Sequence, residues 1–452
     1  MRIKTRQFIA LEGVALLFLL FLGRFAIAES IVSCPAGMKY QGNVCYQPCK
    51  SGYTEDGPVC RKGCSSGFSW DGSACSKFYG VVSYYPDSYA RSTGIPETCN
   101  SSSINKDLPA ASGETAFTML VSSDSQYPWW NRTNVSDEEV KRRGELTNKQ
   151  QIRAMNNITR VSHTSGGKTV TGTWPDSSNV LSSRRGAAIT KPKGLVINGD
   201  LTAFWHDWQV EKYMDLYHRN DADPDNLENL KLDLFPGLGN HDYSNNAGDC
   251  WWTRNLEYVA LGSHGCAKNA SHYIKKMVSC KLVSNFPSGQ ISGFDESSLA
   301  YSWAVGKYFF IQLHNYPTYS YSEIDVSTSI SWLSKELERA NKAGYRSVLL
   351  MHDYGEHMRQ SNSEFLSAIA GKNVVAIFAG HIHQNYGYQG SVPGYSEIAF
   401  FRSGAAEYNT FLLAEFGKDY MTVGVISSLD GKPKFLDPGS GTKMKTIQFS
   451  SP

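Results

Sequence analysis

Apolar residues occur along this chain in short and nearly continuous runs, and glycines, carboxylates or imidazoles follow directly after most of these runs. Near-continuous apolar runs are typical of strands that are buried on both faces of a sheet. The pattern therefore predicts buried strands at residues 117–121, 195–197, 232–235, 308–311, 348–351 and 374–378.

Helical patterns stand between these predicted strands. Ser136 precedes Glu139 by three positions, which is typical of an N-terminal capping box. A second helix is expected between Asp325, as its cap, and Gly344, as its end, because apolar residues recur there at helical spacing. Helices that alternate with strands indicate a layered α/β fold. The apolar residues of this second helix are Ile330, Leu333, Leu337 and Ala340.

A short polar motif follows each of five predicted strands. A single histidine after a strand is more often a packed residue than a ligand, but five motifs in a fixed order favour a shared site. Functional groups in layered folds gather outside the carboxyl ends of the strands, so these motifs are expected to converge. The motifs are Asp124-Ser125-Gln126, Gly199-Asp200, Gly239-Asn240-His241-Asp242, His352-Asp353 and Gly380-His381-Ile382-His383.

The side chains of these motifs offer carboxylate, amide and imidazole groups and no thiolate. Such ligands suit Fe, Zn or Mn rather than a structural zinc site rich in cysteine. The Asp200 carboxylate has two oxygens and can bridge two ions, which would lie about 3.5–4 Å apart and clamp a phosphate group. His241 supplies a further imidazole that can protonate a leaving oxygen, and Asp242 can orient that ring. The sequence therefore predicts a dinuclear metal centre with His241 and Asp242 as catalytic residues.

With these motifs in this order, the chain resembles the calcineurin-like metallophosphoesterase superfamily over residues 115–430. The resemblance implies a four-layer α/β/β/α sandwich with two mixed sheets, and a hydroxide that two metal ions activate for attack on a phosphate ester. It also implies that His241 is the general acid or a phosphate-binding residue. One ion would take Asp124, Gln126, Asp200 and His383, and the other would share Asp200 and add Asn240, His352 and His381.

Two positions refine the resemblance. Gln126 stands where the commonest form of the first motif has histidine, which points to the branch with an Asp-x-Gln motif. An amide oxygen is a weaker, neutral ligand than an imidazole. Ala203 stands where purple acid phosphatases have tyrosine, so a purple enzyme is not expected.

Three functions stay open at this point. The leading interpretation is a metal-dependent hydrolase of phosphate mono- or diesters. A phosphodiesterase similar to phospholipase C or sphingomyelinase is an alternative within the same class of enzyme. An extracellular binding or adhesion protein with weak catalysis on the same fold is the third, but it predicts loss of catalytic groups, whereas Asn240, His241 and both histidines of the last motif are present.

Three further residues are candidates for substrate contact. His314 follows the predicted strand at 308–311 and is a candidate phosphate ligand. Trp129 and Trp205 follow the first two motifs, and an aromatic ring there can hold a nucleobase, a sugar or a quaternary ammonium group. Core packing is the more common role of a tryptophan.

The N-terminal part of the chain has a different pattern. Residues 1–28 combine a basic start, a short apolar run and Ala26-Ile27-Ala28, as a cleavable signal peptide does, although an uncleaved anchor is the alternative. Residues 29–76 contain six cysteines in repeats of period 15, which predicts a small disulfide-rich module with 15 possible pairings. The protein is therefore expected to be secreted, extracellular or periplasmic.

The remaining boundaries follow from composition. Residues 77–114 are expected to be a linker and residues 431–452 a C-terminal tail. Cys250, Cys266 and Cys280 are expected to staple the segment after the third motif. The net charge of +2 excludes an extended nucleic-acid partner. The expected partners are a small phosphate ester or phospholipid as substrate, and a cell surface contacted through the cysteine repeats.

Overall fold

The computed structural model describes residues 103–113, 115–129, 135–219, 226–246, 264–280 and 283–449, together with short segments between residues 39 and 90. The predicted signal peptide at residues 1–28 lies outside the described residues, as do Cys250 and much of the segment after the third motif. Among the described helices, none is long and apolar enough to cross a membrane.

Two large mixed sheets form the body of the protein. The nine-stranded sheet has the order β12-β11-β24-β23-β22-β10-β13-β14, and β25 also pairs with β23. Strands β10, β13 and β14 are parallel, whereas β22 is antiparallel to β10. The bounds are β10 (Phe117–Ser122), β11 (Ser162–Ser165), β12 (Lys168–Thr171), β13 (Leu195–Ile197), β14 (Leu234–Pro236), β22 (Thr410–Phe416), β23 (Tyr420–Ser427), β24 (Lys434–Phe435) and β25 (Met444–Gln448).

The eight-stranded sheet has the order β20-β21-β19-β18-β17-β16-β15-β9. Strands β17, β18, β19 and β21 are parallel, and the strands at both edges are antiparallel to their neighbours. The prediction of an α/β fold with two mixed sheets is therefore confirmed. The bounds are β9 (Ile104–Asn105), β15 (Ile291–Phe294), β16 (Tyr301–Val305), β17 (Tyr308–Gln312), β18 (Arg346–Met351), β19 (Val374–Ala379), β20 (Tyr386–Val392) and β21 (Tyr395–Ser403).

Aromatic side chains pack the two sheets against each other. The ring of Phe117 on β10 lies 6.0 Å from that of Tyr308 and 6.4 Å from that of Phe310, both on β17. Phe416 on β22 also contacts Phe310, at 5.2 Å. Because successive residues of a strand point to opposite faces, the neighbouring Phe309 points the other way and packs in a separate apolar cluster.

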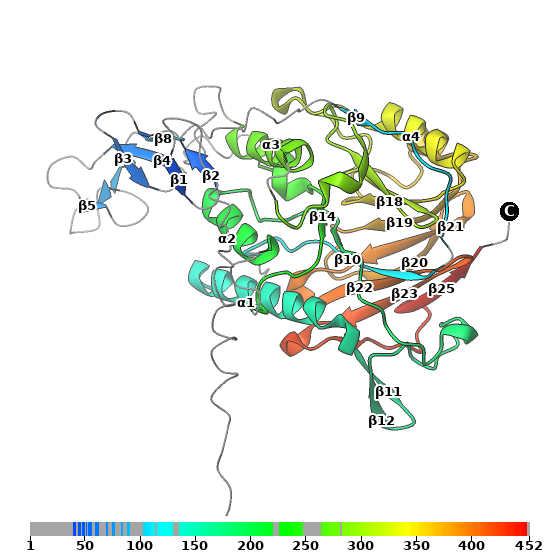
Figure 1. The fold of residues 1–452 in the computed structure, drawn as a ribbon. Coiled ribbons are helices and arrows are strands. Elements are labelled where there is room, and N and C mark those ends of the chain that lie inside the picture. The colour runs from blue at the N-terminus through cyan, green and yellow to red at the C-terminus, as the bar shows by residue number, and fades with distance from the viewer. Residues whose placement is uncertain are drawn as a thin grey trace, which may run out of the picture.

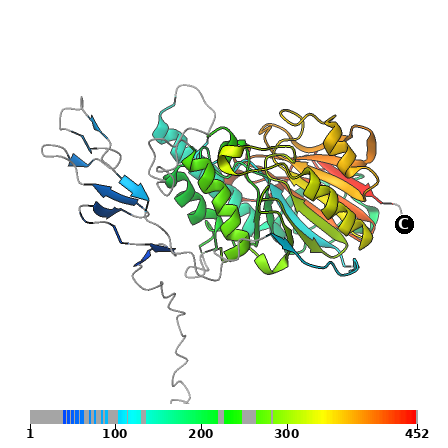
Figure 2. The ribbon, with the colours of Figure 1, turned by 90° about the horizontal axis from the view of Figure 1, so that it is seen from above.

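Some of the helices pack on sheet faces that point away from this interface. The helices are α1 (Asp137–Asn156), α2 (Asp207–Tyr217), α3 (Gly265–Cys280), α4 (Ile330–Lys342) and α5 (Ser363–Ile369). Leu333 and Leu337 of α4 pack in the same cluster as Phe309, and Gln151 of α1 lies 3.4 Å from Ser122 of β10. Figure 1 shows α1 and α4 at these places, and Figure 2 shows green and yellow helices on different sides of the strands.

The predicted start is correct for the first of the two helices and wrong for the second. Ser136 caps α1 as expected, and its hydroxyl accepts a hydrogen bond from the Glu139 backbone at 3.2 Å. The predicted cap of α4 is wrong, because this helix begins after Ser329. Asp325 instead ends a short 3-10 turn in a left-handed conformation with φ 54°.

Strands also occur in the segments expected as linker and tail. β9 joins the eight-stranded sheet, and β24 and β25 continue the nine-stranded sheet past residue 430. Short antiparallel pairs recur in the cysteine-repeat region, one in each repeat, and β7 and β8 extend two of them. These strands are β1 (Lys39–Gln41), β2 (Val44–Tyr46), β3 (Tyr53–Asp56), β4 (Val59–Lys62), β5 (Ser69–Trp70), β6 (Cys75–Ser76), β7 (Ser83–Tyr84) and β8 (Ser88–Ala90).

Candidate metal centre

The carboxyl ends of five strands meet where the two sheets face each other, and each end carries one polar motif. Asp124 follows β10 and its backbone N–H donates to the Gly199 carbonyl at 3.0 Å. His352 follows β18 and its carbonyl accepts from the Gly380 N–H at 2.8 Å. Asn240 begins a single π-helical turn after β14. The five motifs therefore converge as the sequence predicted.

The backbone around these motifs is unusually tight. Asp124, Asp200 and His381 have φ values of 50°, 51° and 71°, in the left-handed region that residues with a side chain rarely adopt. A side chain at Gly239 would lie 2.2 Å from an Asp200 carboxylate oxygen, so only glycine allows that approach. Strain of this kind gathers at functional sites and persists only where the surrounding structure imposes it.

Three imidazoles point one nitrogen each at the carboxylates and the amide in the middle of the site. His352 Nε2 lies 2.8 Å from Asn240 Oδ1 and 3.2 Å from Asp200 Oδ2. His381 Nδ1 lies 3.0 Å from the same Asn240 oxygen. His383 Nε2 lies 3.2 Å from Asp124 Oδ1. One ligand atom each of Asp124, Asp200 and His352 lies within 4.8 Å of the others, which is close enough to share a metal ion.

The other nitrogen of each imidazole faces a hydrogen-bond acceptor. His352 Nδ1 lies 2.8 Å from the Asn198 carbonyl, His381 Nε2 lies 3.0 Å from Glu356, and His383 Nδ1 lies 3.3 Å from Glu407. An acceptor there accepts a hydrogen bond from the ring N–H, so the proton stays on the outer nitrogen and the inward nitrogen carries the lone pair. This is the usual support of a metal-binding histidine. Sequence reasoning missed all three acceptors, because none belongs to a motif.

Two oxygens in this site are buried without a hydrogen-bond donor. They are Asp124 Oδ1 and Gln126 Oε1. The 3.2 Å approach of His383 to Asp124 Oδ1 is an ion-pair distance but does not have the geometry of a hydrogen bond. The Gln126 amide nitrogen donates to Asp200 at 3.4 Å, so its oxygen is the atom left for another partner. Buried oxygens without a donor are costly unless a cation binds them, so these residues fit a metal centre.

The charges of these side chains also fit a metal centre. Burial alone would lower the pKa values of His352 and His383, but Asp200 and Asp124 outweigh it and raise these values to about 9 and about 11. Burial would raise the pKa values of the two aspartates, but the imidazolium charges hold both below their usual range. Protons thus balance the carboxylates here, and cations that bind must displace these protons.

His241 and Asp242 have separate surroundings. The His241 backbone N–H donates to Asp200 Oδ1 at 2.9 Å, and His241 Nδ1 lies 2.9 Å from the Ala203 carbonyl. The prediction that Asp242 orients the His241 ring is therefore wrong. Asp242 instead accepts from the backbone N–H groups of Gly239, Leu201 and Thr202 at 2.8, 3.0 and 3.0 Å, so it holds the two loops together. Burial and the charge of Asp200 raise the pKa of Asp242 to about 7.

Of the three candidate substrate residues, only Trp129 lies in the site. Its ring is 5.1 Å from that of His241 and 6.4 Å from that of His383, and its N–H is buried without a partner. The prediction for Trp205 is wrong, because this side chain is buried in the core with its ring 5.4 Å from Tyr273.

The prediction that His314 binds phosphate is also wrong. Its Nδ1 accepts from the Leu238 N–H at 3.0 Å, and its Nε2 donates to the Leu299 carbonyl at 2.7 Å. Both ring nitrogens are thus occupied inside the protein. Burial lowers the pKa of His314 to about 4, which keeps the ring neutral.

No protein-family model matches this chain, and no curated protein has a matching sequence. Solved structures match it at low similarity. A dimetal phosphatase from Danio rerio has a TM-score of 0.40 and 12% identity over 74% of this chain and 99% of that chain. PhoD has a TM-score of 0.41 and 8% identity over 82% of this chain and 76% of that chain. Such likeness is too distant to assign a family, so the function must rest on the site itself.

Proposed function

We propose that the protein is a metal-dependent hydrolase of phosphate esters, and that it belongs to the calcineurin-like metallophosphoesterase superfamily with its four-layer α/β/β/α fold. One observation carries the proposal: three imidazoles converge on two buried carboxylates and the Asn240 amide oxygen, while each keeps its outer nitrogen on an acceptor. A core of packed histidines needs no such common orientation. The five motifs, in the order typical of this superfamily, add to the same conclusion.

The donor set divides into two groups around Asp200. Asp124, Gln126 and His383 would hold one ion, with one oxygen of Asp200. Asn240, His352 and His381 would hold the other, with the same carboxylate. Two bound ions, of Fe, Zn or Mn, supply Lewis acidity to the phosphoryl group and acidify water. The ligand atoms are oxygen and nitrogen only, which agrees with these metals.

The chain itself supplies the proton for the leaving group in this proposal. The Ala203 carbonyl fixes His241 Nδ1, so Nε2 is the ring nitrogen left to face a substrate. From there the imidazolium donates its proton to the ester oxygen as the bond to phosphorus breaks. Trp129 lies in contact with the His241 ring and would border the ester group.

The test compares two esters on the mature protein. We expect turnover of bis-p-nitrophenyl phosphate or p-nitrophenyl phosphate with added Mn²⁺, and loss of that turnover with a chelator. The better substrate separates a diesterase from a monoesterase. Absence of turnover with both esters, on protein shown to contain two metal ions per chain, contradicts the proposal and favours a binding protein.

Secretion is part of the proposal. Cys49 and Cys266 are disulfide-bonded, and disulfides form mainly in oxidising compartments outside the cytosol. We therefore expect the chain to be exported through residues 1–28 and cleaved after Ala28. N-terminal sequencing of protein from the medium or periplasm tests this, and retention of Met1 would contradict it.

A further inference from the structure

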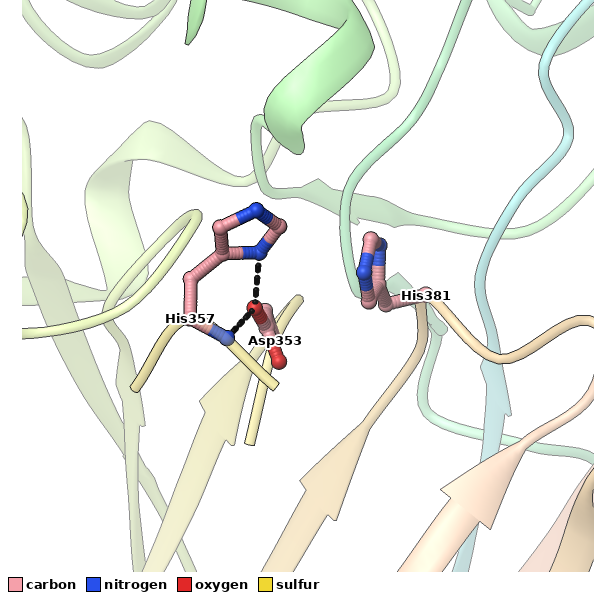
Figure 3. Close-up of side chains that lie close together, drawn as sticks. All are labelled: Asp353, His357 and His381. Atoms are coloured by element: carbon pink, nitrogen blue, oxygen red, sulfur yellow. Dashed lines mark hydrogen bonds and ion pairs between the residues drawn. The ribbon is translucent and has the colours of Figure 1, made fainter. Parts of the chain in front are cut away.

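A second group of metal-binding side chains lies beside the metal centre, on the other side of the His381 ring. One ligand atom each of Asp353, His357 and His381 lies within 4.8 Å of the other two, as in the centre itself. Figure 3 shows the His357 ring above Asp353, with His381 facing them from the next strand end. We call Asp353, Glu356, His357 and the Nε2 atom of His381 the outer cluster.

The distances in the outer cluster suit a small cation. Asp353 Oδ2 lies 2.7 Å from His357 Nδ1, and Glu356 Oε2 lies 3.0 Å from His381 Nε2. Two carboxylates and two imidazoles are a common ligand set for zinc. The His357 and Glu356 side chains are 53% and 58% exposed, so a cation can reach the cluster from solvent and these two side chains can adjust to it.

The inner wall of the outer cluster is fixed. Asp353 is fully buried, and it accepts hydrogen bonds from the Glu356 and His357 backbone N–H groups at 3.1 and 2.8 Å. Arg402 donates to the carbonyls of Tyr354 and Gly380 and so joins the two loops that carry the cluster. Arg402 brings a positive charge near Asp353 and Glu356 of the outer cluster, and near Asp124 of the metal centre as well.

His381 connects the two sites through its single ring proton. With an ion of the metal centre on Nδ1, the ring proton would stay on Nε2, where Glu356 would accept its hydrogen bond at the present 3.0 Å. If Nε2 binds a cation instead, the proton must move to Nδ1, where it is donated to Asn240 at the present distance of 3.0 Å. A neutral imidazole therefore serves one site at a time, and the centre loses a ligand when the outer cluster is filled.

We propose that the outer cluster is a zinc site that competes with the metal centre for His381 and turns the centre off when Zn²⁺ is in excess. The proposal goes beyond the hydrolase activity. Binding of zinc to the outer cluster is independent of the proposed function, whereas its effect on turnover rests on that function. Two measurements separate these parts.

The first measurement is zinc content by equilibrium dialysis in an Asp200→Asn background, where the metal centre is weakened. We expect this variant to hold one equivalent of Zn²⁺ that Asp200→Asn/His357→Phe lacks. Phe keeps the ring beside Tyr316, which stacks at 6.5 Å, but offers no ligand. His357→Cys in the same background should restore the equivalent. Equal zinc content with and without His357 overturns the outer site.

The second measurement is turnover against zinc concentration in the otherwise unchanged protein, where the half-exposed His357 can be replaced without loss of the fold. We expect the wild-type rate to rise and then to fall at least about five-fold in excess Zn²⁺. The turnover rate of the His357→Phe variant should stay at its maximum in excess Zn²⁺. A fall of equal size in both, or in neither, overturns the competition. A wild type without chelator-sensitive turnover contradicts the proposed function alone, and the dialysis result still decides the outer site.

Discussion

The two sheets bring different chemistry to the metal centre. In the proposed assignment the nine-stranded sheet would contribute only oxygen ligands, and the eight-stranded sheet would contribute only imidazole nitrogens. A sheet with the carboxylates alone would gather negative charge with no selectivity for transition metals, and a sheet with the imidazoles alone would offer no bridging group. The centre therefore exists only because the two sheets pack face to face. In the proposed assignment the oxygen ligands are Asp124, Gln126, Asp200 and Asn240, and the nitrogen ligands are His352, His381 and His383.

The supports of the two ligand types differ in the same way. Carboxylates need donors, and backbone N–H groups supply them: that of His381 to Asp124 at 3.1 Å and that of His241 to Asp200 at 2.9 Å. Imidazoles need acceptors that fix the ring proton, and Glu356, Glu407 and a backbone carbonyl provide them. The comparison teaches that the negative charge comes from one sheet, whereas the acceptors that orient the rings come from both, since Asn198 follows β13 of the nine-stranded sheet.

Loss of the shared carboxylate should have the largest effect. Asp200→Asn keeps the shape of the side chain but removes the negative charge that both ions share. We expect kcat/KM to fall by about 10³-fold or more, since several kcal/mol of charge stabilisation are lost. Metal content should fall with it. Asp176→Asn is the matched control, because that side chain is 76% exposed and should leave turnover unchanged. A near-normal rate in Asp200→Asn would show that the ligand assignment is wrong.

Loss of one nitrogen ligand should have a smaller effect than loss of the shared charge. His352→Ala removes one ligand of a single ion, so we expect turnover to fall by about 10²-fold and the metal content to drop by one ion. His352 is fully buried, and its removal leaves a cavity of matching shape, so added imidazole should restore part of the rate. His163→Ala, at another buried histidine, should lower stability without changing turnover per folded molecule. Equal losses of turnover per folded molecule in His352→Ala and His163→Ala would contradict the assignment of His352 as a metal ligand.

Loss of the Glu407 carboxylate, which faces the outer nitrogen of His383, should lower activity less than loss of a ligand does. Glu407→Gln keeps a weak acceptor for His383 Nδ1 but removes its charge, so we expect metal affinity to fall about 10-fold. At saturating metal, turnover should stay within about threefold of the wild type, because the ligand itself is intact. The exposed Glu397→Gln is the control. A turnover defect that excess metal does not correct would mean that Glu407 acts on the substrate and not on the ring.

The motifs could be predicted from sequence because their candidate ligands stand shortly after apolar strands. Parallel strand ends meet at one edge, so position along the chain was enough to place Asp124, Asp200 and His352 together. The acceptors could not be predicted in this way. Glu407 lies 24 residues after the histidine that it supports, in a short turn with no pattern of its own. Only the packing of loops brings the two side chains together.

The incorrect predictions of substrate contact for His314 and Trp205 show what the position of a residue in the sequence cannot predict. His314 follows a strand, and Trp205 follows a motif, just as the residues of the metal centre do. What separates them from the residues of the metal centre is the direction of the side chain, because both side chains point into the core. Their φ values of 58° and 55° do not distinguish them, since Asp124 and Asp200 have similar values. Neither the spacing nor the residue type carries that information.

His314 gives the smallest predicted effect and the sharpest contrast with the histidines of the metal centre. Burial lowers its folded-state pKa to about 4, whereas the unfolded chain binds this proton near the ordinary value of about 6.5. The stability that a neutral His314 contributes is thus complete above that unfolded value and is lost as the pH falls toward 4. Between pH 7 and pH 5.5 the free energy of unfolding should drop by about 1 kcal/mol from this group.

Urea unfolding of wild type and His314→Gln at pH 7 and pH 5.5, both with chelator, isolates this loss, because the other buried histidines titrate alike in both proteins. Glutamine can still donate to the Leu299 carbonyl, so we expect the variant to fold, to keep its turnover per folded molecule, and to lose less stability on acidification than the wild type. An identical pH dependence in the two proteins would mean that the folded protein protonates His314 as readily as the unfolded chain does. A loss of turnover at pH 7 with unchanged metal content would indicate that His314 contacts the substrate. The same imidazole group would then act on phosphate from the sheet that otherwise provides only metal ligands, and the division of roles between the two sheets would not hold.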